Sequence, residues 1–248
     1  MKYNMSKNPE HDIACMVCGT DLVYDKSARE QTCVYCGEST ASPIYCPNGH
    51  FVCDTCHSSS AVELLERLAE LDTSKDPKDV AERAMSHPSF MFHGPEHHGL
   101  VPAAILIAMK NRGVRRPDGS PVTFEVVLEG IRRGMKIPGG FCGYAGACGA
   151  CIGAGVATAI FIGSTPTQGP KRTVAQSATS KALFLSSDGL RRCCKRATYI
   201  GLRTAMDLLR EEYGVDLGES PKYKSCKFSY KSRDCEEESC PYYKGSTS

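Results

Sequence analysis

The chain contains no tryptophan, and aromatic residues make up only 8% of its 248 positions. Proteins that bind single-stranded nucleic acids often stack the bases on aromatic side chains, so this scarcity argues mildly against such a surface. The formal net charge of +2 argues neither for nor against a nucleic-acid partner. We therefore expect a small-molecule substrate rather than nucleic acid.

The sequence also lacks a long apolar run. The two longest, Leu100–Met109 and Ala150–Ile162, are too short to span a bilayer, and glycine interrupts the second. The N-terminal residues contain no apolar segment of the kind found in secretory signal peptides. We expect a cytoplasmic protein without a membrane partner, long enough for one sizeable helical core and a small additional module.

Cysteine, in contrast, is abundant, with 15 residues. In a cytosolic protein such cysteines indicate metal or redox chemistry before disulfides. The densest group lies in Phe141–Gly155, where Cys142, Cys148 and Cys151 are surrounded by glycine and alanine. Small residues let the backbone approach an inorganic group and donate N–H bonds to its sulfurs. The alternative is a core helix with buried free thiols.

The first 58 residues contain four close pairs of soft metal ligands: Cys15 and Cys18, Cys33 and Cys36, Cys46 and His50, and Cys53 and Cys56. Eight ligands are the number needed for two tetrahedral zinc sites. Metal binding would supply the folding free energy that so small a module lacks, and we expect its role to be structural.

The spacing within this module resembles rubredoxin-type knuckles, and Cys46–Cys56 resembles the centre of a RING or FYVE cross-brace finger. The resemblance favours interleaved sites over sequential ones, with His57 as a substitute ligand. The predicted sites are Cys15/Cys18/Cys46/His50 and Cys33/Cys36/Cys53/Cys56. A finger of this kind also offers a surface for a protein partner.

After Ser58 the apolar residues follow a helical period. Val62, Leu64, Leu65 and Leu68 form one stripe behind a serine cap, and Pro77 begins another helix. No strand pattern of useful length follows the finger. We predict a mainly α fold with three parts: a double-zinc finger over residues 1–58, a helical bundle with a metal site over 59–218, and a cysteine-bearing tail over 219–248.

Four of the seven histidines lie between residues 87 and 98, directly before a strongly apolar segment. Imidazoles at a helix entrance suit metal ligation, proton transfer or anion binding, because the helix N-terminus adds positive potential. The alternative is a solvated loop that caps the helix. We predict catalytic roles for His93, Glu96, His97 and His98, and we expect them near the 141–155 stretch.

Two further cysteine groups lie downstream. Cys193 and Cys194 are neighbours, and adjacent residues cannot point the same way on a helix, so at most one should be a ligand from regular structure. The basic residues beside them, Arg191, Arg192, Lys195 and Arg196, would lower thiol pKa values and attract anions. The tail carries Cys226, Cys235 and Cys240. A proline follows Cys240, as in many iron–sulfur motifs, although the spacing is not that of ferredoxins and zinc is an alternative.

Seven cysteines belong to the finger, which leaves eight. Eight could hold two four-thiolate clusters, or one three-thiolate cluster with an open iron and a separate tail site. We expect Cys142, Cys148, Cys151 and Cys193 to converge on one [4Fe-4S] cluster. Zinc is the rival, because it accepts the same thiolates.

Two resemblances to known families add to this interpretation. Over almost its whole length the chain resembles an uncharacterised cysteine-rich family of anaerobic bacteria and archaea, which implies no established activity. The similar motifs are the Cys46–Cys56 finger, the His93–His98 run, the Cys142 stretch, Arg192–Arg196 and the ending after Cys240.

The second resemblance is local, to iron–sulfur L-serine dehydratases and L-cysteine desulfidases. Residues 98–106, HGLVPAAIL, are similar to their Gly-rich loop and the helix that follows it. Residues 193–197, CCKRA, are similar to the Cys-Ile-Glu-Arg-Asn signature beside their cluster, with Cys193 and Arg196 matching. Lys195 and Ala197 replace the Glu and Asn, which leaves the substrate open.

These observations support two classes of function. The first is an iron–sulfur lyase or sulfur-handling enzyme, whose cluster acts as a Lewis acid on a small carboxylate-bearing substrate. Arg192 and Arg196 would bind the carboxylate, and the histidines, with Glu96 and Lys195, would handle protons. The second is a non-catalytic electron carrier or zinc scaffold that docks onto a partner enzyme. The histidine run favours the enzyme, because an electron carrier needs no proton shuttle.

Overall fold

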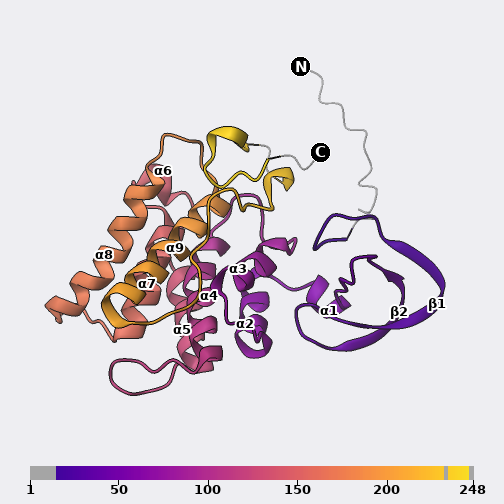
Figure 1. Cartoon of the computed structure of the whole chain (residues 1–248), viewed down its shortest axis with the longest axis horizontal. Helices are drawn as coiled ribbons and strands as arrows, with labels where there is room; N and C mark the ends of the chain where they lie inside the picture. Colours follow the sequence, from indigo (N-terminus) through magenta and orange to yellow (C-terminus); the bar gives the residue numbers. More distant parts are fainter. Residues whose placement is uncertain (1–14, 232–233, 246–248) are drawn as a thin grey trace. The chain divides into compact units, whose positions relative to one another are not determined.

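The computed structural model describes residues 15–231 and 234–245. The first residues of the chain, where we expect no signal peptide, lie outside this range. The chain divides into two units, Met1–Ser58 and Ser59–Ser248, so the cysteine-bearing tail belongs to the second unit. Element labels follow Figure 1.

The first unit is an antiparallel hairpin with little apolar interior. Strand β1 (Val23–Thr32) pairs with β2 (Ser39–Tyr45), and a four-residue helix, α1 (Asp54–His57), follows. Both strands are mostly exposed, and apart from Tyr35 the buried apolar residues in the described range 15–58 are all cysteines. The hydrophobic effect therefore contributes little to the stability of this unit.

The second unit is helical. Its eight α-helices within the described residues are α2 (Ala61–Leu71), α3 (Pro77–Ser86), α4 (Glu96–Arg112), α5 (Phe124–Met135), α6 (Phe141–Tyr144), α7 (Gly149–Ile162), α8 (Gly169–Ser186) and α9 (Cys194–Tyr213). Two short 3-10 helices, Ser229–Lys231 and Glu237–Ser239, lie in the C-terminal segment. The predicted mainly α architecture with an N-terminal finger is confirmed.

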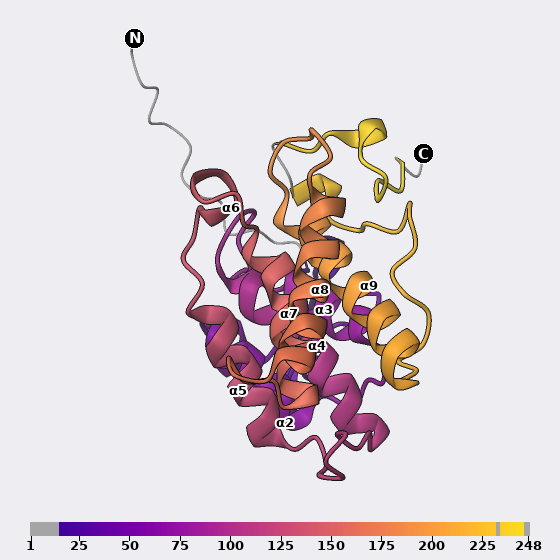
Figure 2. The same ribbon diagram turned by 90° about the vertical axis from the view of Figure 1, so that its left-hand side faces the viewer.

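Helices α4 and α7 form the centre of this unit. α4 packs against α2, α3, α5, α7 and α9, and α7 also contacts α5, α8 and α9 (Figure 2). Every residue from Leu100 to Met109 is buried, as expected for a helix that is apolar all round. Among the described residues, no helix combines the length and apolar character that crossing a membrane requires.

Glycines let the helices approach closely. A Cβ atom on Gly134 of α5 would lie 2.4 Å from the backbone oxygen of His98 in α4. Only glycine permits this contact, which holds α5 against the first turn of α4. This contact fixes the first turn of α4, which carries His97 and His98, relative to α5.

The C-terminal segment is anchored to the helices by buried aromatic residues. Tyr242 stacks on Tyr199 of α9, with ring centroids 5.3 Å apart, and Tyr199 donates a hydrogen bond to Glu82 Oε1 at 2.9 Å. Residues 224–226 pair with 241–243 through backbone hydrogen bonds. Figures 1 and 2 show this segment, α6 and the loop between α8 and α9 at one end of the unit.

Candidate metal sites and the adjoining cavity

The finger brings its eight predicted ligands together in two groups of four. In Cys15/Cys18/Cys46/His50 and in Cys33/Cys36/Cys53/Cys56, the ligand atoms all lie within 4.8 Å of one another. The pairing is interleaved, as favoured from the sequence, and His57 belongs to neither group.

The distances within these groups fit one tetrahedral ion each. Cys18 Sγ and Cys46 Sγ are 3.6 Å apart, and so are Cys36 Sγ and Cys53 Sγ. Tetrahedral zinc with Zn–S bonds of about 2.3 Å would separate its sulfurs by roughly 3.8 Å. Each group could therefore hold a metal ion, and its donor set suits zinc.

Knuckle-like turns place the first two cysteine pairs. Gly19 and Gly37 adopt φ values of +74° and +71°, and their amides donate to the carbonyls of Cys15 and Cys33. A residue with a side chain would be strained in this conformation. Burial raises the pKa of Cys18, but hydrogen bonds with Thr20 and Asn48 outweigh it and bring the pKa to about 5. A thiolate at neutral pH is the form that binds metals.

The second unit has a cavity of about 540 Å³. Its wall comes from four segments: the entrance to α4, the loops around α6, the end of α8, and the start of α9. In Figures 1 and 2 these segments meet at the end of the unit that also carries the tail. A cavity of this size suits a small molecule.

Cysteines from two of these segments line the cavity. They are Cys142 in α6, Cys148 at the N-cap of α7, and the neighbours Cys193 and Cys194 at the start of α9. Cys151, which the sequence also suggested as a ligand, is fully buried outside the wall, and its sulfur lies 3.5 Å from Ala182 O. Its hydrogen bond to Cys148, one turn earlier, lowers the pKa of Cys148 to about 6. Cys151 therefore lies next to Cys148 but does not line the cavity.

Two of the predicted histidines also line the cavity. His98 Nδ1 donates a hydrogen bond to Ile137 O at 3.0 Å, so Nε2 carries the free lone pair. A backbone carbonyl that fixes the ring in this way is typical of metal-ligating or basic histidines. His93 Nε2 lies 3.3 Å from Asp234 Oδ2, and its Nδ1 is buried without a hydrogen-bond partner. A buried nitrogen without a hydrogen-bond partner destabilises the fold unless a bound ligand supplies that partner.

His97 lies behind the wall instead. Its Nε2 accepts a hydrogen bond from Lys195 Nζ at 3.0 Å, and its Nδ1 donates to Gly94 O at 3.1 Å. Lys195 Nζ also donates to the carbonyls of Phe90 and Met91, and Glu96 Oε1 lies 3.2 Å from His97 Nδ1. Burial lowers the pKa of His97 to about 4, so the ring stays neutral. Successive residues on a helix point about 100° apart, so His97 and His98 diverge.

The predicted catalytic residues therefore occupy two places. His93 and His98 lie in the cavity wall, close to the cysteine stretch, whereas Glu96, His97 and Lys195 form a buried network that does not line it. A Cβ on Gly149 would lie 2.4 Å from the His98 ring, which shows how closely the histidine approaches α7.

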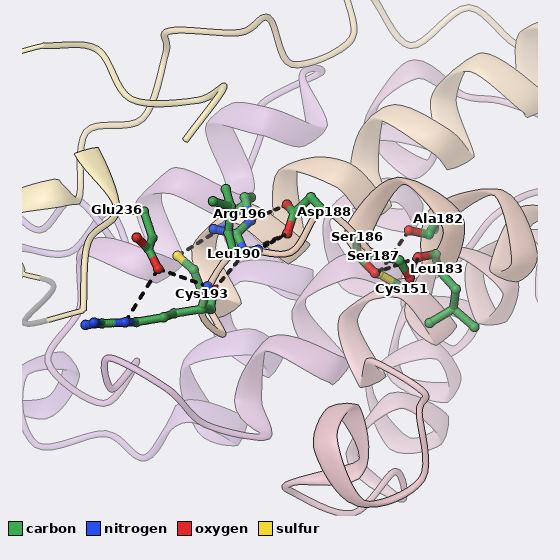
Figure 3. A network of polar contacts seen from close by, with 11 residues as sticks. Cys151, Ala182, Leu183, Ser186, Ser187, Asp188, Leu190, Cys193, Arg196 and Glu236 are labelled. Carbon is green, nitrogen blue, oxygen red and sulfur yellow. Dashed lines mark hydrogen bonds and ion pairs between the residues drawn. The ribbon is translucent and has the colours of Figure 1, made fainter. Parts of the chain in front are cut away.

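Both predicted substrate-binding arginines line the cavity, but they differ in exposure and in their charge partners. Arg196 is buried and its charge is paired: its Nε lies 2.9 Å from Asp188 Oδ2, and Nη2 donates to Arg191 O at 2.7 Å (Figure 3). Arg192 lines the cavity, is exposed, and makes no ion pair within the described part of the chain. Among the described residues of the cavity wall, Arg192 is thus the cation without an ion pair, whereas Arg196 binds Asp188 and Arg191 O in the α8–α9 loop.

The tail cysteines surround a separate, small pocket. Cys226, Cys235 and Cys240 line it together with Cys193. The wall also contains the cations Lys195 and Arg196, the carboxylates Asp234 and Glu236, and the aromatic residues Phe228, Tyr242 and Tyr243. From the sequence we expect Cys193 to join Cys142, Cys148 and Cys151 in one cluster, whereas here Cys193 lines both the cavity and the tail pocket. The adjacency of Cys193 and Cys194 implies that their two sulfurs point in different directions.

Comparison with known proteins gives one match. Residues 65–243 match DUF5714, a family of unknown function. No curated protein and no solved structure matches the chain, so no named relative supports the resemblance to dehydratases. Because the matched residues are well over half of the chain, the protein belongs to the DUF5714 family.

Proposed function

We propose that the second unit is an iron–sulfur enzyme that acts on a small carboxylate-bearing substrate in the 540 Å³ cavity. The observation that carries this proposal is the composition of the cavity wall. It combines the thiols of Cys142, Cys148 and Cys194 with two histidines and an unpaired arginine. A mere structural site needs neither a substrate-sized cavity nor groups that move protons.

The three thiols suit a cluster that leaves one iron without a protein ligand. Such an iron supplies Lewis-acid chemistry at a hydroxyl or thiol of the substrate, which fits a lyase or a sulfur-handling reaction. The glycine-rich backbone around Cys142 and Cys148 leaves space for an inorganic group, because no side-chain atom lies within 4 Å of a Cβ on Gly143 or Gly146. Cys193 borders the same cavity but also faces the tail pocket.

The chain's own residues would bind and orient the substrate. Arg192 would bind the carboxylate, since its guanidinium has no other ionic partner among the described residues and presents paired N–H donors. His93 Nδ1 and His98 Nε2 would exchange the proton, because each is a ring nitrogen without a protein partner. The buried Glu96–His97–Lys195 network would hold the entrance to α4 in place.

The second candidate function is an electron carrier, and the tail cysteines beside the cavity favour it. A carrier would need neither Arg192 nor the histidines. In either case the exposed hairpin of the finger offers a docking surface for a protein partner.

The test uses the full chain, purified and reconstituted anaerobically with iron and sulfide. We expect an absorbance band near 400 nm and a change in the cluster's EPR spectrum when L-serine or L-cysteine is added. Cys142→Ser and Cys194→Ser should lose iron, and Cys151→Ala, a nearby thiol outside the wall, should keep most of it. Arg192→Gln should keep the iron but weaken the response to amino acid. Unchanged iron in both cavity variants would refute the cluster, and a spectrum that no small carboxylate changes would favour the carrier.

A further inference from the structure

The tail pocket brings together four cysteines from distant parts of the chain. Cys193 caps α9, and Cys226, Cys235 and Cys240 belong to the C-terminal segment. The cavity proposed as the active site accounts only for Cys193, so the other three thiols need another explanation.

We propose that Cys193, Cys226, Cys235 and Cys240 hold a second, four-thiolate iron–sulfur cluster. This site goes beyond the proposed function, and it stands whether or not the cavity is catalytic. Four protein thiolates would complete the coordination of a cubane, so this cluster would have no open iron.

The spacing of the tail thiols differs from that of the finger ligands. Within the described residues, only the two finger groups have three or more ligand atoms within 4.8 Å of one another. The tail thiols surround a pocket but are spread more widely than those ligands. Thiolates on a cubane bind four different irons and stand further apart than thiolates on one zinc. The finger thus shows, in the same molecule, the ligand spacing of a single-ion site with which the tail thiols can be compared.

The backbone around the pocket is arranged to stabilise bound sulfur. The amide of Arg196 donates to Cys193 Sγ at 3.4 Å (Figure 3), and the amide of Phe228 donates to Cys226 Sγ at 3.4 Å. Such N–H bonds favour thiolates and tune the potential of iron–sulfur clusters. The ladder between residues 224–226 and 241–243 holds Cys226 close to the Cys240 turn.

The charges also fit an anionic cluster. Lys195 and Arg196 both line the pocket, and both are almost completely buried, with exposed fractions of 4% and 6%. Buried cations are costly unless a negative group balances them. Asp188 pairs with Arg196, and Lys195 Nζ donates to two carbonyls and to His97, with the Glu96 carboxylate nearby. Asp234 and Glu236 also line the pocket, and the two buried cations would offset part of the negative charge of a cluster there.

The adjacent cysteines would then serve different centres. Cys193 would belong to the tail cluster and Cys194 to the cavity, so one peptide unit would join the two. The tail would supply three of the four ligands, so its attachment to α9 would hold these ligands beside Cys193.

The experiment compares two double variants of the full chain after anaerobic reconstitution with iron and sulfide. Cys235→Ser/Cys240→Ser removes two tail ligands, and Cys142→Ser/Cys148→Ser is the matched control in the cavity. We expect the tail variant to lose about half of the cluster iron and one of the EPR signals of the dithionite-reduced protein. The control should keep that same signal. Circular dichroism and an unchanged zinc content would show that both variants are folded.

A measurement on the unaltered chain covers the case in which a variant fails to fold. Native mass spectrometry under anaerobic conditions should show zinc in the finger and a further cluster mass that chelation of zinc does not remove. If the tail variant keeps all iron, the proposal is overturned. If the unaltered chain instead carries a zinc ion beyond those of the finger, and the tail variant loses it, the pocket is a zinc site and the proposal is wrong. Loss of a cluster only in the cavity control would uphold the proposed function and overturn this inference.

Discussion

Single residues set the geometry of the cavity wall, and Gly149 is the clearest case. It is the first residue of α7, and the His98 ring occupies the space that a side chain would need. The ring is held in place by its hydrogen bond to Ile137 O. The histidine therefore keeps its position only because residue 149 has no Cβ atom.

We predict that Gly149→Ala displaces His98 and lowers the free energy of unfolding by about 1–3 kcal/mol, the usual cost of overpacking. The helix propensity of alanine offsets part of this loss. Iron content should fall as well. Gly169→Ala is the control, because Gly169 is likewise the first residue of its helix and a Cβ there meets open space. Urea unfolding and iron analysis measure both effects, and equal stability of the two variants would contradict the predicted clash.

A second residue-scale prediction concerns Tyr199. Its hydroxyl donates to Glu82 Oε1, and both groups are buried. We expect Tyr199→Phe to destabilise the chain by about 1–2 kcal/mol, because the carboxylate loses a charge-assisted hydrogen bond in a dry environment. Tyr144, which is 95% exposed, gives the matched control Tyr144→Phe, expected to have no effect. Thermal unfolding of the two variants checks the difference.

At the scale of elements, the start of α9 combines two roles in one residue. Cys193 is the N-cap, and its sulfur accepts a hydrogen bond from the Arg196 amide while lining the tail pocket. Serine is among the best N-cap residues, whereas alanine is a poor one. The cap and the ligand roles can therefore be separated by substitution.

We predict that Cys193→Ser and Cys193→Ala both lose the tail cluster, but that only Cys193→Ala also loses the cap, at a cost of about 1 kcal/mol. The measurement is the unfolding midpoint of each variant in its iron-free form, together with its iron content after reconstitution. If serine retained the full iron content, Cys193 would not be a ligand.

The elements also show what the sequence could predict. The serine cap before α2 and the proline at the start of α3 are local signals, and both are found where expected; the cap is Ser60, which forms a capping box with Glu63. Helix α4 begins at Glu96, however, so His97 and His98 are part of the helix and point in different directions. The sequence placed these histidines together at the helix entrance. The different surroundings of the two histidines depend on how α4 packs against α5 and α7. This packing relies on glycine contacts, which produce no periodic pattern in the sequence.

At the scale of the whole molecule, the two units depend on different stabilising interactions. The helical unit buries a large apolar core around α4 and α7, whereas the finger buries mainly cysteines. Ligand pairing in the finger was predictable, because short spacings and few topologies constrain it. The grouping of the other eight cysteines was not, because it depends on where long loops return in space.

We predict that a zinc chelator unfolds the finger of the full chain and leaves the helical unit folded, since bound metal supplies most of the finger's stability. Hydrogen–deuterium exchange should show loss of protection in β1 and β2 and unchanged protection in α4 and α7. Protection that persists in the hairpin after zinc has been removed would contradict the metal-dependent account.

The central claim is that the cavity holds a cluster with one iron open to substrate. Mössbauer spectroscopy tests it most directly, on the Cys235→Ser/Cys240→Ser variant reconstituted with ⁵⁷Fe, in which only the cavity cluster should remain. We predict one iron that is distinct from the others and whose parameters shift when a small hydroxy or thiol carboxylate binds. A spectrum in which all irons are equivalent and unaffected by such carboxylates, or the absence of cluster iron, would contradict the account.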